Sequence, residues 1–276
     1  MKVSQLSLLL SSVFAADFYT STNDAMKANP DAVKEVVDKN SRRPDVASIA
    51  IHGGTIERYS DNFARKLYDS LDSAAFYNFN CSIDEKISNG IETNNCYKKI
   101  CCKKIDDNNN EDYDQTQCKD SKEECTKKQV CHPNAMHVTS TVFDSKKFSN
   151  LIRSKFIVSW HGFAERGDIQ VIVGGRYDNI QKVAGDIQNS IGDENKVVYC
   201  KYRGNAPYCY YVNGNRKVND IGELAGIHEK NVANRNGGGI HIEMSRSYRN
   251  RNKDGDEKMI NAIINNLPIR NIDSSY

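Results

Sequence analysis

Residues 46–57 read VASIAIHGGTIE, and this stretch indicates how the chain folds. Residues 46–51 form a short apolar run, which is typical of a buried strand. The two glycines that follow permit a tight turn. Residues 60–71 then carry apolar side chains every four positions, at Phe63, Leu67 and Leu71, which predicts a helix capped by Ser60. A buried strand joined to a helix by a tight turn is the repeating unit of an α/β fold.

The same alternation continues along the chain. Further strands are predicted at residues 74–79, 136–139, 156–160, 169–173, 197–201 and 239–244. Helices are predicted where Asp144 precedes Phe148, Leu151 and Ile152, where Ile180, Val183, Ala184 and Ile187 recur, and near residues 256–267. We therefore expect an α/β fold with a mixed, mostly parallel sheet that is flanked by helices on both faces.

Residues 81–131 interrupt this alternation, because they are rich in Asn, Asp, Lys and Cys and show neither the helical nor the strand period. Seven of the nine cysteines lie in this segment. A long segment without periodicity inside a compact domain is explained if disulfides hold it together, so we predict a disulfide-rich insertion. The other two cysteines, Cys200 and Cys209, flank a turn-like stretch and could pair with each other.

The N-terminus has the features of a secretory signal peptide. Lys2 precedes an apolar run at residues 6–13, and Val13-Phe14-Ala15 resembles a cleavage site. We expect residues 1–15 to be removed and residues 16–276 to form one secreted, extracellular domain; a buried first helix is the alternative. No later run approaches the roughly 20 apolar residues that cross a bilayer, so no membrane span is expected. We expect a monomer with no nucleic-acid partner.

The charge distribution bears on the substrate. The chain has a formal net charge of +2, and all fourteen arginines lie outside the insertion. A mildly cationic domain favours an anionic substrate, although a mixed, solvated surface explains the same composition.

Three segments combine a predicted strand with residues that bind metals or move protons. His52 and Glu57 lie on either side of the glycine turn, and His161 ends the apolar strand at 156–160. In residues 237–246, GGGIHIEMSR, a period of two places His241 and Glu243 on one face of a strand and the apolar residues on the other. Ligands of open α/β sheets bind at the carboxyl ends of the strands, so we expect these side chains to meet there.

Two histidines and one glutamate, with a fourth position left for water, form the ligand set of a hydrolytic zinc site. Such an ion lowers the pKa of water to about 7 and polarises the substrate carbonyl, while a separate carboxylate takes the proton. The alternative is that these histidines are ordinary structural residues held by hydrogen bonds.

Six motifs taken together resemble those of the poly-γ-glutamate hydrolase family. They are HGGTIE at 52–57, HVTSTVFD at 137–144, SWHG at 159–162, VGGR at 173–176, NVANR at 231–235 and GGIHIEMSR at 238–246. The opening residues 17–21, DFYTS, are also similar to the mature start of that family. The resemblance leaves out the insertion and the C-terminal helix. It implies a fold like that of zinc carboxypeptidases and an activity on the γ-glutamyl amide bonds of poly-γ-glutamate.

The resemblance assigns roles residue by residue. His52, Glu57 and His161 match the zinc ligands, although the spacing of His52 and Glu57 is wider than the His-x-x-Glu of ordinary carboxypeptidases. Glu243 matches the general base, which returns the proton to the leaving amine.

Other residues in matching motifs are predicted to bind substrate: Arg176, Asn234, Arg235, Arg246 and His137. An arginine suits this role because its planar guanidinium meets carboxylates bidentately. His137 is also the main rival for a ligand position. His241 departs from the family pattern and is expected to alter a substrate contact near Glu243.

The sequence leaves two alternatives open, one with the same chemistry and one from a different class. The first is a secreted zinc peptidase or cell-wall amidase that acts on other amide bonds. The second is a catalytically silent polymer-binding protein.

Overall fold

The computed structural model describes residues 21–28, 33–81, 137–153, 155–203, 206–214 and 216–268, together with the backbone of 104–105 and 111–112; for residues 203 and 206 it gives the backbone alone. The expected signal peptide at 1–15 lies outside these residues. So does nearly all of the insertion at 81–131, in which only β4 (Lys104–Ile105) and β5 (Glu111–Asp112) are described and pair antiparallel.

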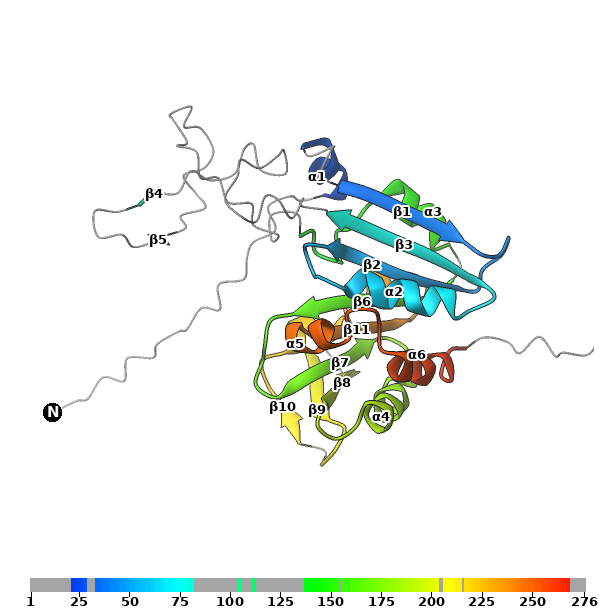
Figure 1. The fold of residues 1–276 in the computed structure, drawn as a ribbon. Helices are drawn as coiled ribbons and strands as arrows, with labels where there is room; N and C mark the ends of the chain where they lie inside the picture. The colour runs from blue at the N-terminus through cyan, green and yellow to red at the C-terminus, as the bar shows by residue number, and fades with distance from the viewer. Residues whose placement is uncertain are drawn as a thin grey trace, which may run out of the picture.

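The domain is built on one mixed sheet, which confirms the predicted α/β class (Figure 1). Its strands are β1 (Val33–Lys39), β2 (Val46–Gly54), β3 (Ala74–Cys81), β6 (Phe156–Phe163), β7 (Ile169–Gly175), β8 (Lys196–Arg203), β9 (Ala206–Tyr211), β10 (Lys217–Val218) and β11 (Ile240–Ser245). Their order is β1-β3-β2-β6-β11-β7-β8-β9-β10. The run β3-β2-β6-β11 is parallel, whereas β7 pairs antiparallel with β11 and the outer strands β1, β9 and β10 pair antiparallel with their neighbours.

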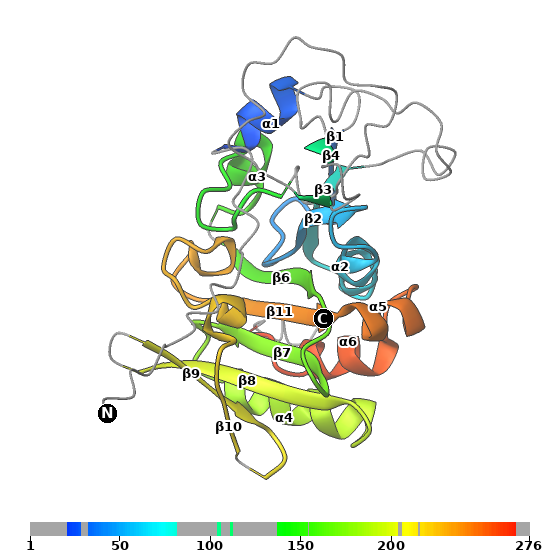
Figure 2. The same cartoon turned by 90° about the vertical axis from the view of Figure 1, so that its left-hand side faces the viewer.

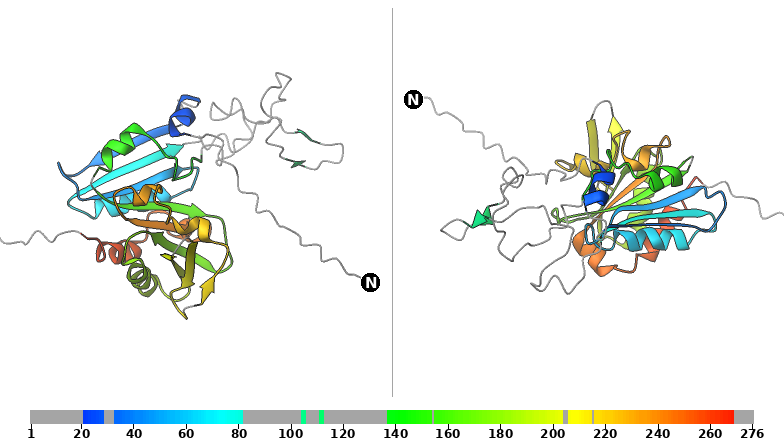
Figure 3. Two further views of the ribbon diagram at one scale, coloured as in Figure 1. Left: turned by 180° about the vertical axis from the view of Figure 1, so that it is seen from behind. Right: turned by 90° about the horizontal axis from the view of Figure 1, so that it is seen from above.

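Helices cover both faces of this sheet (Figure 2). They are α1 (Thr22–Ala28), α2 (Ser60–Asp69), α3 (Lys146–Leu151), α4 (Ile180–Ile191), α5 (Arg246–Arg251), α6 (Glu257–Ile264) and the 3₁₀ turns η4 (Gly222–Ala225) and η5 (Val232–Asn234). One core cluster joins α2, α4 and α6 to the sheet, and a second joins α3 and η5 to the opposite face (Figure 3).

The pattern along β2 explains why this strand is apolar throughout. Val46 and Ala50 pack in the cluster of α2, whereas Ala47, Ile49 and Ile51 pack in the cluster of α3. A strand that is covered on both faces loses the alternation of apolar and polar residues and becomes a continuous apolar run.

Two helix starts differ from the prediction by one residue. Tyr59, in the left-handed conformation with φ 70°, precedes α2, so Ser60 is the first helical residue and provides no cap. Ser145 caps α3 by accepting from the Phe148 N–H, whereas Asp144 accepts from the backbone N–H of Thr22. At α2 a left-handed residue precedes the helix and no side chain caps it, whereas at α3 the next residue is the cap and the predicted one makes a tertiary contact.

The strand predicted at 136–139 is wrong for its described part, since residues 137–139 are irregular. The Val138 carbonyl accepts a hydrogen bond from His52 and not from a neighbouring strand. Strands β1, β9 and β10 were not predicted. The pairing allowed for Cys200 and Cys209 is confirmed: the two cysteines face each other across β8 and β9, with their Cα atoms 4.1 Å apart, and form a disulfide. None of the described helices is long and apolar enough to cross a bilayer.

Candidate active site

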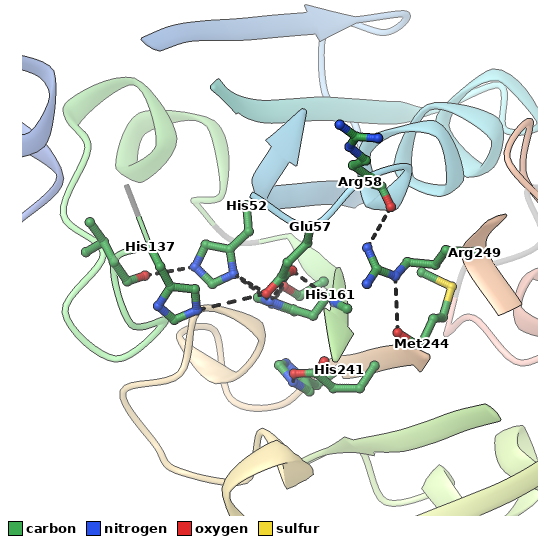
Figure 4. Close-up of polar contacts among 12 residues, drawn as sticks. His52, Glu57, Arg58, His137, His161, His241, Met244 and Arg249 are labelled. Atoms are coloured by element: carbon green, nitrogen blue, oxygen red, sulfur yellow. Dashed lines mark hydrogen bonds and ion pairs between the residues drawn. The ribbon is translucent and has the colours of Figure 1, made fainter. Parts of the chain in front are cut away.

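Three neighbouring parallel strands carry the predicted site residues. His52 lies near the end of β2, His161 in β6 and Glu243 in β11, and β6 lies between the other two. Glu243 is the register partner of His161, so the two side chains lie on the same face of the sheet. Figure 4 shows the side chains of His52, Glu57 and His161 converging. The topology therefore brings together residues that are far apart in sequence, as the strand-end argument predicted.

The turn after β2 brings Glu57 back to His52. Gly54 has φ +70°, and a Cβ there would meet the Cys81 carbonyl oxygen at 2.4 Å, so only glycine fits. The Glu57 N–H donates to the His52 carbonyl at 2.9 Å and closes the turn. As a result, Glu57 Oε1 lies 2.8 Å from His52 Nδ1.

His161 completes a group of three buried donor residues. Its Nδ1 lies 3.5 Å from Glu57 Oε2 and 3.2 Å from His52 Nδ1. The three residues are each at most 9% exposed. Two imidazoles and one carboxylate thus direct their donor atoms to one point.

The second nitrogen of each ring is held by the protein. His52 Nε2 donates to the Val138 carbonyl at 2.9 Å, and His161 Nε2 lies 2.8 Å from Ser159 Oγ. The Gly162 N–H donates to Glu57 Oε2 at 2.9 Å. Metal-ligating histidines and carboxylates are commonly oriented by partners of this kind.

The hydrogen bond to Val138 has a consequence for His52. A carbonyl can only accept, so Nε2 carries the proton and the neutral ring presents a lone pair at Nδ1. That lone pair faces a carboxylate oxygen at 2.8 Å, which is also an acceptor. A proton or a metal cation must therefore lie between the two atoms.

The charges in this cluster are strongly coupled. Burial opposes protonation of His52, but the Glu57 carboxylate and the hydrogen bonds to it raise the pKa of His52. Burial likewise opposes ionisation of Glu57, yet His52 and His161 hold its pKa well below the usual range. Burial and the neighbouring His241 lower the pKa of His161 to about 3. His161 is therefore neutral, which is the form that binds metals.

Glu243 and His241 form a pair beside this group. His241 Nε2 lies 3.1 Å from Glu243 Oε1, and the His241 ring stacks on that of His161 with centroids 4.4 Å apart. Among the described residues, neither Glu243 Oε2 nor His241 Nδ1 has a hydrogen-bond partner. Burial raises the pKa of Glu243, and the neighbouring His241 opposes this shift. The two-residue alternation of a strand predicted that His241 and Glu243 share one face of the sheet. In the structure both side chains line the cavity of the site.

His137 lies at the open side of the cluster. Its Nε2 is 3.9 Å from Glu57 Oε1, and its ring centroid is 4.0 Å from that of His52. The donor atoms of His52, Glu57 and His137 fall within 4.8 Å of one another, so His137 could also contribute to a metal site. Its side chain is 36% exposed, whereas that of His161 is 2% exposed.

The cluster opens into a cavity of about 960 Å³. Its walls include Thr139, Phe163, Tyr202, Ile227 and His228, none of which the sequence had singled out as wall residues. They come from four separate segments, and no local pattern connects them.

The predicted substrate-binding residues fall into two groups. Arg176 is exposed on the cavity wall, where its Nε donates to the Ile227 carbonyl and its guanidinium lies 5.3 Å from the Tyr202 ring centroid. Asn234 is buried behind it and accepts from the Arg176 backbone N–H. Arg235 and Arg246 do not line the cavity.

Arg235 donates to the Phe143 carbonyl, and Arg246 is exposed at the start of α5. A role for either in substrate binding stays a prediction. Arg249, three residues after Arg246, was missed although it is only 5% exposed and adjoins the site. Its helix reads RSYRNR and gives no signal by which the buried arginine could be told from its exposed neighbours.

The comparisons with known proteins bear on the fold and on the family. A zinc-free structure of YndL matches with a TM-score of 0.56 and 18% identity, over 90% of this chain and 96% of that one. The structure of a bacteriophage poly-γ-glutamate hydrolase matches with a TM-score of 0.54 and 14% identity, over 90% and 94% of the two chains. At these identities the matches show that the fold is shared. The comparison with curated proteins finds no match.

The family model of poly-γ-glutamate hydrolases matches residues 124–261, which is half of the chain. The matched range includes His137, His161 and Glu243. His52 and Glu57 precede this range, and it is the fold that brings them next to His161. The chain belongs to the poly-γ-glutamate hydrolase family.

Proposed function

We propose that this protein is a secreted, zinc-dependent hydrolase that cleaves the γ-glutamyl amide bonds of poly-γ-glutamate. The observation that carries the proposal is the convergence of His52, Glu57 and His161 on one point beside Glu243, whose Oε2 has no hydrogen-bond partner among the described residues. Family membership supports the reaction class, and the sequence motifs support the assignment of roles.

The donor set fits a zinc ion. Two imidazole nitrogens and a carboxylate oxygen are ligands that zinc accepts, with a fourth position left for water. His52 Nδ1 and Glu57 Oε1, 2.8 Å apart, need a proton or a metal cation between them, and a zinc ion would meet that need. Zinc bound by these residues would activate water and polarise the substrate carbonyl. His137 is the alternative third ligand, because its Nε2 also approaches Glu57.

We assign the role of general base to Glu243. His241 occupies one carboxylate oxygen, so Oε2 remains to accept a proton from the attacking water. The raised pKa of Glu243 makes its carboxylate a stronger base than an exposed glutamate. The proton then passes from Glu243 to the nitrogen of the leaving amine as the amide bond breaks.

One wall of the cavity carries a cationic side chain that could bind an anionic polymer. Poly-γ-glutamate carries a free α-carboxylate on each residue, and the exposed Arg176 guanidinium offers a planar set of donors to such a group. The Arg176 backbone and Nε are held by Asn234 and Ile227, which fixes the direction of the side chain.

The test compares two polymers that carry the same charge per residue and differ in the amide linkage. Poly-γ-glutamate and α-linked polyglutamate are incubated with the zinc-loaded mature protein, with and without chelator. We expect chelator-sensitive cleavage of the γ-linked polymer alone. Cleavage of the α-linked polymer would indicate the peptidase alternative, and binding of the γ-linked polymer without cleavage would indicate a silent polymer-binding protein.

Secretion and processing are further parts of the proposal. The apolar N-terminus and the disulfide between Cys200 and Cys209 favour an oxidising compartment. N-terminal sequencing of the secreted protein should begin at Ala16. Non-reducing peptide mapping should show the clustered cysteines of 81–131 paired mostly with each other; a majority of free thiols would contradict the predicted insertion.

A further inference from the structure

Arg249 lies behind the site, on the side away from the cavity, and contacts the residue that follows each of three site residues. Its Nη1 donates to the Arg58 carbonyl at 2.6 Å, next to Glu57. Its Nε donates to the Met244 carbonyl at 3.2 Å, next to Glu243. Figure 4 shows the guanidinium between these two carbonyl groups.

The third contact is with Gly162, which follows His161. A Cβ at Gly162 would lie 2.2 Å from the Arg249 Cζ, so the guanidinium occupies the space that a side chain would fill. The Gly162 N–H also donates to Glu57 Oε2, so this residue is held from both sides. The Arg249 guanidinium thus contacts the turn after β2 and the strands β6 and β11.

Arg249 is a buried cation without an adjacent counter-ion. It is 5% exposed, and within the described part of the chain no carboxylate lies within 4.0 Å of its guanidinium. Burial lowers the pKa of Arg249, while the negative charges of Glu57 and Glu243 oppose this shift. An arginine is nevertheless charged at all ordinary pH values. A buried charge is costly unless the fold compensates it, so the place of Arg249 between the Arg58 and Met244 carbonyl groups calls for an explanation.

We propose that Arg249 is the positioning residue of this site: its guanidinium fixes the backbone next to Glu57, His161 and Glu243 and so sets the distance between the metal ligands and the general base. This inference rests on the proposed function. Only a planar group with several donors in fixed directions makes all three contacts, and a lysine, with a single charged nitrogen, does not.

The test uses Arg249→Lys and Arg249→Met in the full mature protein, with the same two substitutions at Arg251 as matched controls. Arg251 belongs to the same helix but is exposed and bonds to Gln170 and Asn195. Zinc affinity is measured by competition with a chelating dye. The parameters kcat and KM are measured with poly-γ-glutamate as the substrate, and Tm is measured by thermal unfolding.

For Arg249→Lys we expect zinc affinity and kcat to fall by about 10–100-fold, as for other groups that orient metal ligands. KM should stay within about threefold of the parent, because the substrate does not touch Arg249. The Arg251 variants should match the parent in zinc affinity and kcat. A purely structural role would lower Tm and leave zinc affinity and kcat of the folded fraction unchanged, and that result would overturn the proposal.

A second variant tests the same contact from the other side and remains informative if the Arg249 variants do not fold. Gly162→Ala keeps the guanidinium but displaces it, so it should cause a similar loss of zinc affinity and kcat. The double variant Gly162→Ala, Arg249→Lys should lose no more than the worse single variant. Additive losses, or a Gly162→Ala protein with parental zinc affinity and kcat, would overturn the proposal.

The parent protein separates this inference from the proposed function. A parent that binds zinc but does not cleave poly-γ-glutamate would refute the substrate, while the zinc affinities would still test Arg249. A parent that cleaves the polymer, with unaffected Arg249 variants, would refute only the positioning role.

Discussion

Glu35 and Glu243 lie on strands of the same sheet, and their side chains are little exposed but differ in their surroundings. The side chain of Glu35, on β1, is 7% exposed; it accepts from the Tyr77 hydroxyl at 2.7 Å and from the Ser145 hydroxyl, and Lys147 Nζ lies 3.9 Å from Oε2. The side chain of Glu243, on β11, is 8% exposed and has one partner, His241.

The difference separates structural polar groups from functional ones. Glu35 ties β1, β3 and α3 together, and its oxygens have partners within the protein. Glu243 keeps a buried oxygen without a partner among the described residues, although such an oxygen costs stability. Ser60, Asn78 and Asn80 also have such atoms, but Glu243 and His241 combine them with a position on the cavity wall, where a substrate, a water molecule or an ion can reach them.

The largest expected effect comes from removing the donor cluster. The double variant His52→Ala, His161→Ala leaves one carboxylate where three ligands converged, so zinc and hydrolysis should both be lost. Metal analysis and turnover on the same preparation measure this, and circular dichroism checks the fold. Stoichiometric zinc in the folded double variant would contradict the assigned ligands.

The next effect comes from Glu243→Gln, which is nearly isosteric and cannot accept a proton. Zinc should be retained, and kcat should fall by at least roughly 10²–10⁴-fold, the usual contribution of general base catalysis. Zinc content and kcat are compared with those of the parent. Turnover within a few-fold of the parent would assign the proton transfer to another group, with His137 or His241 next to be tested.

His137→Ala should have a smaller effect. Its ring lies against His52 at the exposed side of the cluster, so we expect a loss of about 10–100-fold in zinc affinity or kcat. His161→Ala is the matched comparison and should lose more zinc, because the His161 side chain is buried and lies nearer to Glu57. If the order is reversed, His137 replaces His161 as the third ligand.

The smallest expected effect on turnover comes from substitution of Glu35. Glu35→Leu removes the oxygen to which the Tyr77 and Ser145 hydroxyls both donate, and the unpaired hydroxyls should lower the free energy of unfolding by about 1–3 kcal/mol. Activity of the folded protein should be unchanged. Urea unfolding and turnover measure the two quantities; reduced kcat at full stability would show that Glu35 is coupled to the site and would remove the contrast with Glu243.

Much of the fold follows from local patterns. The apolar runs at β2, β6, β7 and β8 and the spacing of Ile180, Val183, Ala184 and Ile187 in α4 predicted elements that the structure contains. Of the strands that were missed, β1 and β10 are the two edge strands and β9 lies next to β10. The sequence of β1, VKEVVDK, is polar enough to pass for a loop. Edge strands bury less surface than central ones, so their sequences carry a weaker signal.

The sequence by itself determined the class of the fold, the residues that could bind a metal and the strand ends on which they lie, because these depend on periodicity and residue chemistry. Only the tertiary structure decided that β2, β6 and β11 are neighbours, that His52 Nε2 donates to the Val138 carbonyl, and that Arg249 lies behind the site. The physical reason is that the cost of burying a charge or an unpaired oxygen depends on contacts between segments far apart in the chain, and these contacts leave no local pattern in the sequence.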